Sequence, residues 1–291
     1  MKREKKLWIV FALVMSISFA VLGYYGYEIY QQAPPVPKEI ITDSGKVVFS
    51  ETEIKDGQNI WQSIGGQEVG SIWGHGAYVA PDWTADWLHR EALFILDKFA
   101  KEDFNKKFDE LDAEKQSALK VRLQKDLRTN RYDANTGVLT ISENRLAAIE
   151  NLSEYYKGLF TNDPKFDKLR EEYAIPKNSI KDDARMHKMN AFFFWATWAT
   201  VTNRPDSDIS YTHNWPSDEL VGNKATKELL AWSGVSIILL ILSIGILVFY
   251  HAKSGEEEFP LPKEDPIINQ GKTPSMKLVV KYFWIVSLLM I

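Results

Sequence analysis

The chain has 291 residues, enough for roughly one to three domains, and it carries a formal net charge of -4. It contains no cysteine, which excludes disulfides, thiolate metal sites, cysteine nucleophiles and haem attachment through a C-x-x-C-H motif. Binding of nucleic acid is not expected either, because no basic stripe with interleaved aromatic side chains is present.

The first apolar segment, residues 7–27, has no charged side chain and follows the basic residues 1–6. As a helix it would span about 31 Å, enough to cross a bilayer core. The alternative is a cleaved signal peptide, but the run is too long and no A-x-A-like site follows it. The basic flank favours a cytoplasmic N-terminus. Residues 28–37, which include QQAPPVP, are then predicted to be an extended linker outside the cytoplasm.

Residues 38–226 are predicted to form the outer domain. A short strand is expected at residues 46–49, and capping-box spacing from Ser50 to Glu53 predicts a helix that ends before the glycines at 65–66. Further helices are expected from about residue 84 to Phe99, over 101–130 as a solvated helix, over 145–160, and over 182–202, where an almost uniformly apolar second half predicts burial.

A second uncharged run, residues 229–250, is long enough to return the chain across the membrane. Residues 251–277 are predicted to be a solvated cytoplasmic loop. Residues 278–291 are apolar to the last position but would span only about 21 Å as a helix. Because a half-span leaves backbone carbonyls unpaired in lipid, we expect this segment to be the truncated start of a third membrane helix in a longer protein. The alternative is a helix completed by tilt, bilayer thinning or a partner.

The stretch from Gly65 to Glu91, GGQEVGSIWGHGAYVAPDWTADWLHRE, combines five glycines with three tryptophans. Glycines allow close backbone approach, and indole rings supply large, rigid contact area. Two interpretations stay open. The stretch either presents a face to other helices, or it is a glycine-loosened turn under a tryptophan-rich core.

Catalytic motifs are absent: no nucleotide-binding glycine loop and no G-x-S-x-G nucleophile elbow occurs. Asp82, Asp86 and His89 have helical spacing that makes a metal site conceivable. Hydrogen bonding of His89 to surface carboxylates is the favoured alternative. We therefore predict no catalytic and no cofactor-binding residue in this chain, and the residues by themselves indicate a membrane-anchored support domain.

Together with FFFWATWATVTNRP and YTHNWP, the glycine-tryptophan stretch resembles the N-terminal region of quinol-dependent nitric oxide reductase, a member of the haem-copper oxidase superfamily. The resemblance covers nearly the whole chain. It implies a mainly α fold in which membrane helices flank an extracytoplasmic, cytochrome c-like domain. It also implies the reduction of two NO to N2O and water in denitrification, with electrons from quinol.

In cytochrome c-dependent relatives, a C-x-x-C-H motif precedes a G-x-G-A-Y segment. Residues 66–70 fall at the position of that motif, so the resemblance implies the same fold without haem c. The haem b, haem b3 and non-haem iron would be bound by helices beyond Ile291. Tryptophans such as Trp61, Trp73 and Trp83 are expected to fill the vacated volume. Gly76 and Tyr78 match positions that help to bind calcium in the relatives, so the resemblance implies a metal role for these two residues. The alternative is that Gly76 only allows close backbone approach and Tyr78 packs at the interface.

The resemblance further implies these partners: membrane lipid, the rest of the catalytic helix bundle, quinol, and a second copy in a homodimer. The location would be a bacterial cell membrane, crossed several times, with the large domain outside the cytoplasm. A different hypothesis is a membrane-anchored extracytoplasmic sensor or ligand-binding module, since two spans around an outer domain are common to both classes. The sensor hypothesis predicts a soluble output domain after the second span, whereas an apolar run begins at residue 278.

Overall fold

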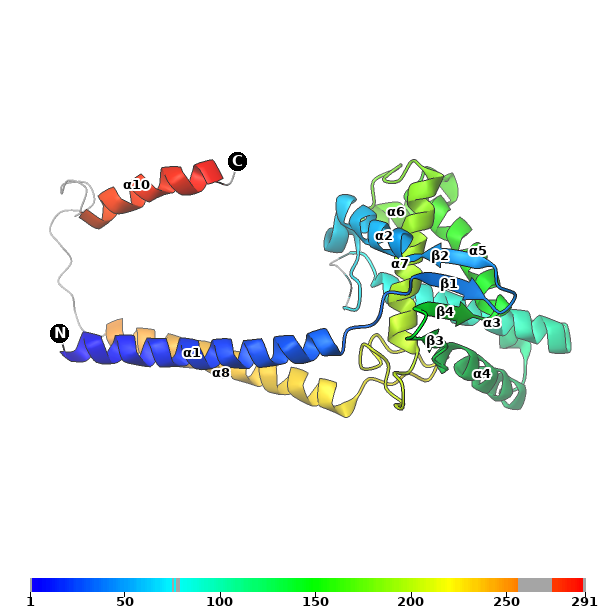
Figure 1. The fold of residues 1–291 in the computed structure, drawn as a ribbon, viewed down its shortest axis with the longest axis horizontal. Helices are drawn as coiled ribbons and strands as arrows, with labels where there is room; N and C mark the ends of the chain where they lie inside the picture. The colour runs from blue at the N-terminus through cyan, green and yellow to red at the C-terminus, as the bar shows by residue number, and fades with distance from the viewer. Residues whose placement is uncertain (1, 75, 77–78, 256–273, 290–291) are drawn as a thin grey trace. The chain divides into compact units, whose positions relative to one another are not determined.

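The computed structural model describes the chain except for residues 1, 75, 77–78, 256–273 and 290–291 (Figure 1). It divides into two compact units, residues 1–230 and 231–291. The described residues are mostly helical with one small sheet. The prediction of a mainly α fold is therefore confirmed.

Two described helices are long and apolar enough to cross a membrane. Helix α1 (Lys2–Gln31) contains the candidate span Trp8–Gln31, and helix α8 (Lys227–Gly255) contains the candidate span Lys227–Lys253. Neither span is buried within the protein. These two candidate spans overlap the apolar runs at residues 7–27 and 229–250 that the sequence singles out.

Helix α10 (Pro274–Leu289) lies in the second unit and begins four residues before the expected start at residue 278. Most of the predicted loop 251–277 lies outside the described residues.

Helix α2 (Glu51–Ser63) begins with the predicted capping box. The Glu53 N–H donates to Ser50 Oγ at 3.4 Å, and the Ser50 N–H donates to Glu53 Oε2 at 2.8 Å. These two bonds satisfy backbone donors that the first turn cannot pair internally. The helix ends before Gly65, whose φ of 123° only glycine adopts readily.

Helix α3 (Trp83–Phe104) ends at Asn105, which adopts a left-handed conformation with φ 55°. A short 3-10 turn follows, η2 (Phe108–Glu110), before helix α4 (Ala113–Arg128) begins. The predicted solvated helix over 101–130 is therefore confirmed as α4, whose buried residues are Leu119, Leu123 and Leu127, but the range is not one continuous helix. A left-handed residue ends the first helix, and Asp112 caps the second by accepting the Lys115 N–H at 3.0 Å.

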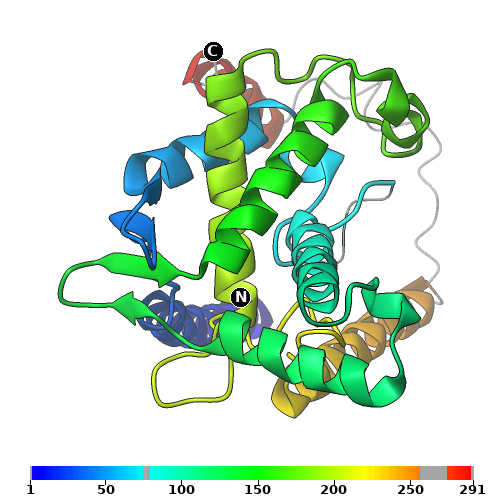
Figure 2. The ribbon, with the colours of Figure 1, turned by 90° about the vertical axis from the view of Figure 1, so that its right-hand side faces the viewer.

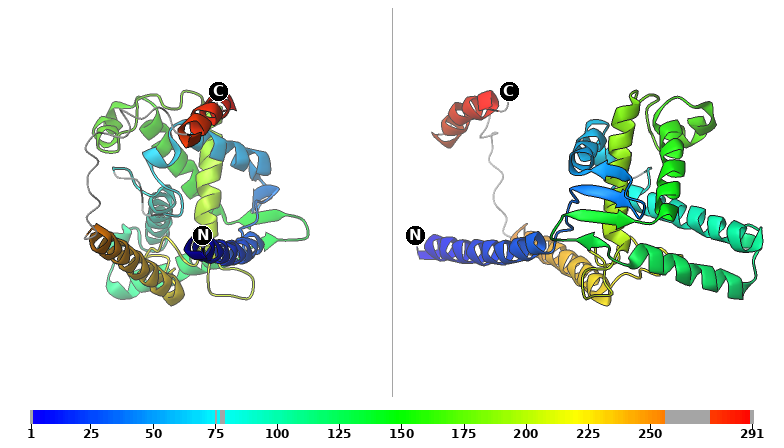
Figure 3. Two further views of the ribbon diagram at one scale, coloured as in Figure 1. Left: turned by 90° about the vertical axis from the view of Figure 1, so that its left-hand side faces the viewer. Right: turned by 45° about the vertical axis from the view of Figure 1, so that its right-hand side comes forward.

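The sheet has four short strands in the order β2-β1-β4-β3 (Figure 3). Strand β1 pairs antiparallel with β2 and parallel with β4, which in turn pairs antiparallel with β3. The sequence predicted a strand at 46–49, which β2 confirms, and missed the other three. The strand bounds are β1 Glu39–Thr42, β2 Val47–Ser50, β3 Tyr132–Asp133 and β4 Val138–Ile141.

Helix α7 (Asp183–Val201) is the centre of the outer domain. It packs against α2, α3 and α5 (Glu143–Phe160), and Figure 2 shows it between α2 and α5. Its second half is buried on nearly all sides, as its uniformly apolar sequence predicts. A short 3-10 turn, η3 (Pro164–Phe166), begins at Pro164 and leads into α6 (Asp167–Glu172).

Candidate functional site

Asp82 fixes both the glycine-rich loop, residues 65–82, and the start of α3. Its Oδ2 accepts hydrogen bonds from Ser71 Oγ at 2.6 Å and from the Gly74 N–H at 2.7 Å. Its Oδ1 accepts from the N–H groups of Thr84 and Ala85, both at 3.0 Å, so Asp82 is the N-cap of α3. One buried carboxylate thus holds the loop against the helix N-terminus, where the helix dipole favours negative charge.

Ser71 closes the same loop from its other side. Its N–H donates to Pro81 O at 3.2 Å, and its own carbonyl accepts from the Trp83 N–H at 2.9 Å. Its hydroxyl oxygen accepts from the Gly76 N–H at 2.7 Å while the hydroxyl donates to Asp82. Ser71 thus pairs backbone groups at Gly76, Pro81 and Trp83 that would otherwise need water.

Gly70 lets the loop pass directly over a tryptophan ring. Its φ is 128°, and a Cβ at this position would lie 2.2 Å from Trp83 Nε1 and 2.7 Å from Pro81 O. No side chain fits such a space, so glycine is required here for close approach as well as for its backbone angle. Trp73 is also in a left-handed conformation, with φ 55°. Its Nε1–H donates to Ala196 O at 2.8 Å, and its ring packs against Trp195 with centroids 5.4 Å apart.

The tryptophans of the stretch lie inside the outer domain. Trp83 and Trp87 are both 0% exposed, and Trp73 is half-buried against α7. The interpretation that these rings present a face to other helices is therefore wrong for Trp83 and Trp87, and the alternative of a tryptophan-rich core is confirmed. The rings turn inward because the loop closes over them through Asp82 and Ser71.

We call five buried rings of this core the aromatic stack. Trp87 and Tyr156 are stacked at 5.2 Å with an interplanar angle of 5°, and Trp83 stacks on Phe193 at 5.8 Å. Trp83 also meets Tyr156 edge-on at 6.1 Å. Offset and edge-on pairs of this kind add to the stability gained from burial alone. The aromatic stack comprises Trp83, Trp87, Tyr156, Phe160 and Phe193, all 0% exposed.

The hydroxyl of Tyr156 donates to Asp86 Oδ2 at 2.7 Å. The same oxygen accepts from Arg90 Nε at 2.9 Å, and the Arg90 guanidinium lies 3.8 Å from the centroid of the Tyr155 ring. Burial raises the pKa of the Tyr156 phenol well above its ordinary value, and the nearby Asp86 raises it further. Burial likewise raises the pKa of Tyr155 to about 12. Both phenols are therefore neutral at physiological pH.

Glu91 and Arg145 form an ion pair in the interior, with side chains 0% and 4% exposed. Arg145 Nε donates to Glu91 Oε1 at 2.7 Å and Nη2 donates to Oε2 at 3.3 Å. The guanidinium also lies 4.8 Å from the Phe194 ring centroid. The two-pronged geometry joins α3 to α5 and offsets part of the cost of removing both charges from water.

The three residues of the conceivable metal site do not converge on one point. Asp82 caps α3 and Asp86 bonds Tyr156 and Arg90, whereas His89 Nδ1 lies 2.7 Å from Asp218 Oδ2. The described residues contain no group of three or more histidine, cysteine or acidic side chains that could bind a metal ion. The alternative, in which His89 bonds a carboxylate, is confirmed.

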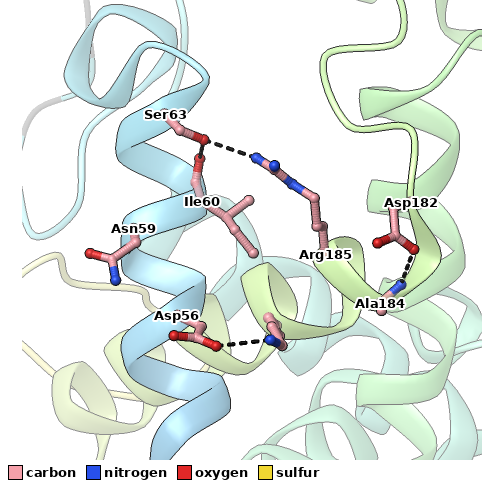
Figure 4. Close-up of a pocket in the computed structure, with 8 residues that line it drawn as sticks. Asp56, Asn59, Ile60, Ser63, Asp182, Ala184 and Arg185 are labelled. Atoms are coloured by element: carbon pink, nitrogen blue, oxygen red, sulfur yellow. Dashed lines mark hydrogen bonds and ion pairs between the residues drawn. The ribbon is translucent and has the colours of Figure 1, made fainter.

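A polar groove of about 360 Å³ lies between α2 and the start of α7 (Figure 4). Lys188 Nζ lies 2.8 Å from Asp56 Oδ2, and Arg185 Nη2 donates to Ser63 Oγ at 3.0 Å. These bonds cross from one helix to the other. The groove is lined by Asp56, Asn59, Ile60, Ser63, Asp182, Ala184, Arg185 and Lys188.

Comparison with protein families identifies residues 37–217 as the NorB cytochrome c-like domain of nitric oxide reductase. The match covers more than half of the chain. The chain belongs to this family. A search of curated proteins gave no match. One candidate membrane helix precedes the matched domain and one follows it in the sequence, so the chain is a membrane protein.

The described residues of this nitric oxide reductase domain do not fit a haem c. The chain has no cysteine to attach one, and residues 66–69 form a short 3-10 helix, η1 (Gly66–Val69). Gly70 follows directly and lies against the Trp83 indole. The volume beneath this segment is filled by the aromatic stack, with Trp61, 7% exposed, in the same core. Of the three tryptophans expected to fill that volume, Trp83 and Trp61 are buried and Trp73 is only partly buried.

Of the two residues predicted to help bind calcium, the structure describes only Gly76. Tyr78 lies outside the described residues, and the Gly76 N–H is bonded to Ser71 Oγ at 2.7 Å. The nearby acid is Asp82, both of whose oxygens already accept hydrogen bonds. Calcium binding by Gly76 and Tyr78 therefore stays a prediction.

Proposed function

We propose that this chain is the N-terminal part of a quinol-dependent nitric oxide reductase. In this proposal the enzyme reduces two NO to N2O and water, and the outer domain supports and covers the haem-bearing helix bundle without contributing a catalytic residue. The observation that carries the proposal is the family match at residues 37–217, which stands between two apolar helices. Both ends of the domain are thus next to membrane segments.

Quinol is the electron donor that fits a domain without a haem. A cytochrome c-dependent enzyme would receive electrons through a haem c in this domain, but the chain has no cysteine and its core is filled by rings. A quinol oxidised to quinone releases two electrons and two protons, which balances the conversion of two NO to N2O and water. The donor would reach the bundle from the lipid, so the outer domain needs no electron-carrying cofactor.

In the same proposal, haem b, haem b3 and the non-haem iron belong to the rest of the helix bundle, and the outer domain lies outside the cytoplasm of a bacterial cell. Calcium would be bound with help from the carbonyl of Gly76 and the oxygen of Tyr78. Replacing Tyr78 by phenylalanine in the full-length protein should lower calcium content and haem retention. Unchanged calcium and haem content would contradict the calcium assignment. Sedimentation of the purified protein would test for a homodimer.

The decisive experiment expresses the complete gene that encodes this chain and measures NO consumption by the membranes without oxygen. We expect consumption with a quinol as electron donor and none with reduced cytochrome c alone. Omitting the quinol is the control for background loss of NO. Consumption driven only by cytochrome c would refute quinol dependence, and no consumption with either donor would refute the proposal.

A sensor or ligand-binding module is the second candidate, and the polar groove between α2 and α7 favours it (Figure 4). Its charged side chains bond across the groove, Lys188 to Asp56 and Arg185 to Ser63. A ligand would therefore have to displace existing bonds. Binding of a small polar ligand to the full chain, abolished by replacing Arg185 with glutamine, would support this candidate over a support role.

A further inference from the structure

Tyr156 differs from the tryptophans of the aromatic stack in having a partner for its acidic proton. Its hydroxyl donates to Asp86 Oδ2 at 2.7 Å. By contrast, Trp83 Nε1 and Trp87 Nε1 are buried without a hydrogen-bond acceptor in the described part of the chain. Packing alone does not require these polar groups, because a phenylalanine would fill most of the volume of each ring. The pattern of unpaired indole N–H groups beside a paired phenol therefore needs another explanation.

This difference in hydrogen bonding determines which ring of the aromatic stack is left oxidised after the loss of one electron. A phenol that loses an electron becomes a very strong acid, so its oxidation is easy only when a base can take the proton. An oxidised indole without an acceptor keeps its N–H proton and remains a cation in an apolar interior, which is costly. A vacancy on Trp83 or Trp87 is therefore transferred to Tyr156, which becomes a neutral radical.

We propose that Tyr156 is a one-electron redox site, with Asp86 as its proton acceptor and with Trp83 and Trp87 as the rings through which its electron leaves. The oxidant is a nitrogen-oxide radical of the nitrogen dioxide class. The electron passes from Tyr156 to the oxidant, which becomes nitrite, and the phenolic proton passes to Asp86 Oδ2. The products are a neutral tyrosyl radical, a protonated Asp86 and nitrite, so charge and atoms balance.

Continuous ring contacts lead from the stack to less buried positions. Trp73 and Trp195 are both half-buried, with ring centroids 5.4 Å apart. Trp195 stacks on Phe192 at 6.1 Å, Phe192 meets Phe193 at 6.2 Å, and Phe193 stacks on Trp83 at 5.8 Å. An oxidant at the surface of the domain therefore has a path of touching rings to the buried tyrosine.

The neighbouring tyrosine is a poorer site. The Tyr155 ring is 5.2 Å from that of Tyr156, but the Arg90 guanidinium lies 3.8 Å from its centroid. A positive charge on the ring face disfavours removal of an electron from that ring. Arg90 also bonds Asp86, so the same cation keeps the carboxylate in place beside the Tyr156 hydroxyl. The vacancy is thus confined to Tyr156.

Pulse radiolysis of nitrite in the presence of the full chain in detergent micelles tests the proposal, with transient absorption and electron paramagnetic resonance as readouts. In the wild-type chain we expect the tryptophanyl signal to decay as a tyrosyl signal grows, at a rate independent of protein concentration and slower in D2O. Tyr156→Phe should abolish this phase. Asp86→Asn should slow it by about tenfold, equivalent to about 1.4 kcal/mol of activation free energy.

Tyr173→Phe is the matched control. Tyr173 also touches Trp83, at 6.3 Å, but no hydrogen bond from its hydroxyl to a carboxylate exists among the described residues, and its pKa is raised chiefly by burial. This variant should keep the full tyrosyl phase, and near-ultraviolet circular dichroism checks that each variant is folded. Persistence of the phase in Tyr156→Phe, or no transfer from tryptophan in the wild type, overturns the proposal.

The proposed function enters this inference only through the identity of the oxidant, because NO is the source of nitrogen dioxide in the presence of oxygen. Radical transfer needs no enzyme turnover. If the complete gene gave no NO consumption with either donor while this chain still showed the tyrosyl phase, the proposed function would be refuted and the redox site would stand. NO consumption by the full-length protein with quinol, without a tyrosyl phase in this chain, would refute the redox site and leave the proposed function standing.

Discussion

Replacing Asp82 by alanine tests whether one carboxylate holds the glycine-rich loop and the start of α3 together. The substitution removes the acceptor of five hydrogen bonds, from Ser71, Gly74, Ala85 and twice from Thr84. Loss of an N-cap costs about 1 kcal/mol of stability. A buried donor left without a partner costs about 1–3 kcal/mol more, and this applies in full to the Ser71 hydroxyl and in part to the Gly74 N–H, which is partly buried.

The expected loss for Asp82→Ala is therefore about 4 kcal/mol, a large part of the roughly 5–15 kcal/mol that stabilises a typical domain. Urea unfolding of the full chain in detergent, followed by tryptophan fluorescence, measures it. The fluorescence is a suitable signal because Trp83, next to the substitution, is fully buried.

Asp112→Ala is the matched control. Asp112 is also an N-cap, of α4, but its backbone bond to Lys115 is at the surface. We expect a much smaller loss of stability, since no buried donor is orphaned. Asp82→Asn keeps one acceptor oxygen and should lie between the alanine variant and the wild type. If Asp82→Ala and Asp112→Ala shift the urea midpoint equally, Asp82 is only a helix cap and the reasoning about the loop is refuted.

Three further predictions concern the core. Gly70→Ala places a Cβ 2.2 Å from Trp83 Nε1 and should cost about 3 kcal/mol or more in urea unfolding, through overpacking and backbone strain. Glu91→Gln leaves the Arg145 charge buried without a carboxylate and should cost about 3–5 kcal/mol by the same assay. Burial raises the pKa of Tyr155 from 10.0 to about 12, so between these pH values the folded state keeps a proton that the unfolded chain loses. The contribution of this phenol to the free energy of unfolding is therefore complete below pH 10 and disappears as the pH rises to about 12. Tyr155→Phe should therefore flatten the alkaline limb of a stability profile.

Each of these changes has a comparison that separates its cause. Gly45 also has a positive φ, 84°, but open space around it, so Gly45→Ala should cost only about 1 kcal/mol. Glu150→Gln, which breaks the exposed ion pair with Lys46, should lower the free energy of unfolding by less than about 1 kcal/mol. Equal losses at the buried and exposed positions would contradict the role given to burial. An unchanged alkaline limb in Tyr155→Phe would contradict the assignment of the pH effect to that phenol.

The sequence determined the features that depend on local pattern. Apolar length predicted α1 and α8, and the capping box at Ser50 predicted the start of α2. An all-round apolar second half predicted the burial of α7. These signals are readable because helix caps and helix periodicity are set by residues only three or four positions apart. The absence of cysteine was likewise enough by itself to exclude a covalently attached haem.

Only the tertiary structure decided which way the tryptophans face. The glycine-tryptophan stretch has a composition that would also suit an exposed binding surface. Closure of the loop by Asp82 and packing of α7 instead turn the rings of Trp83 and Trp87 into the core. The partners of Tyr156 and Arg145 are Asp86 and Glu91, each more than fifty positions away. Pairs so far apart leave no local pattern, because their proximity depends on how α3 and α5 pack. The parallel pairing of β1 with β4 went unpredicted for the same reason.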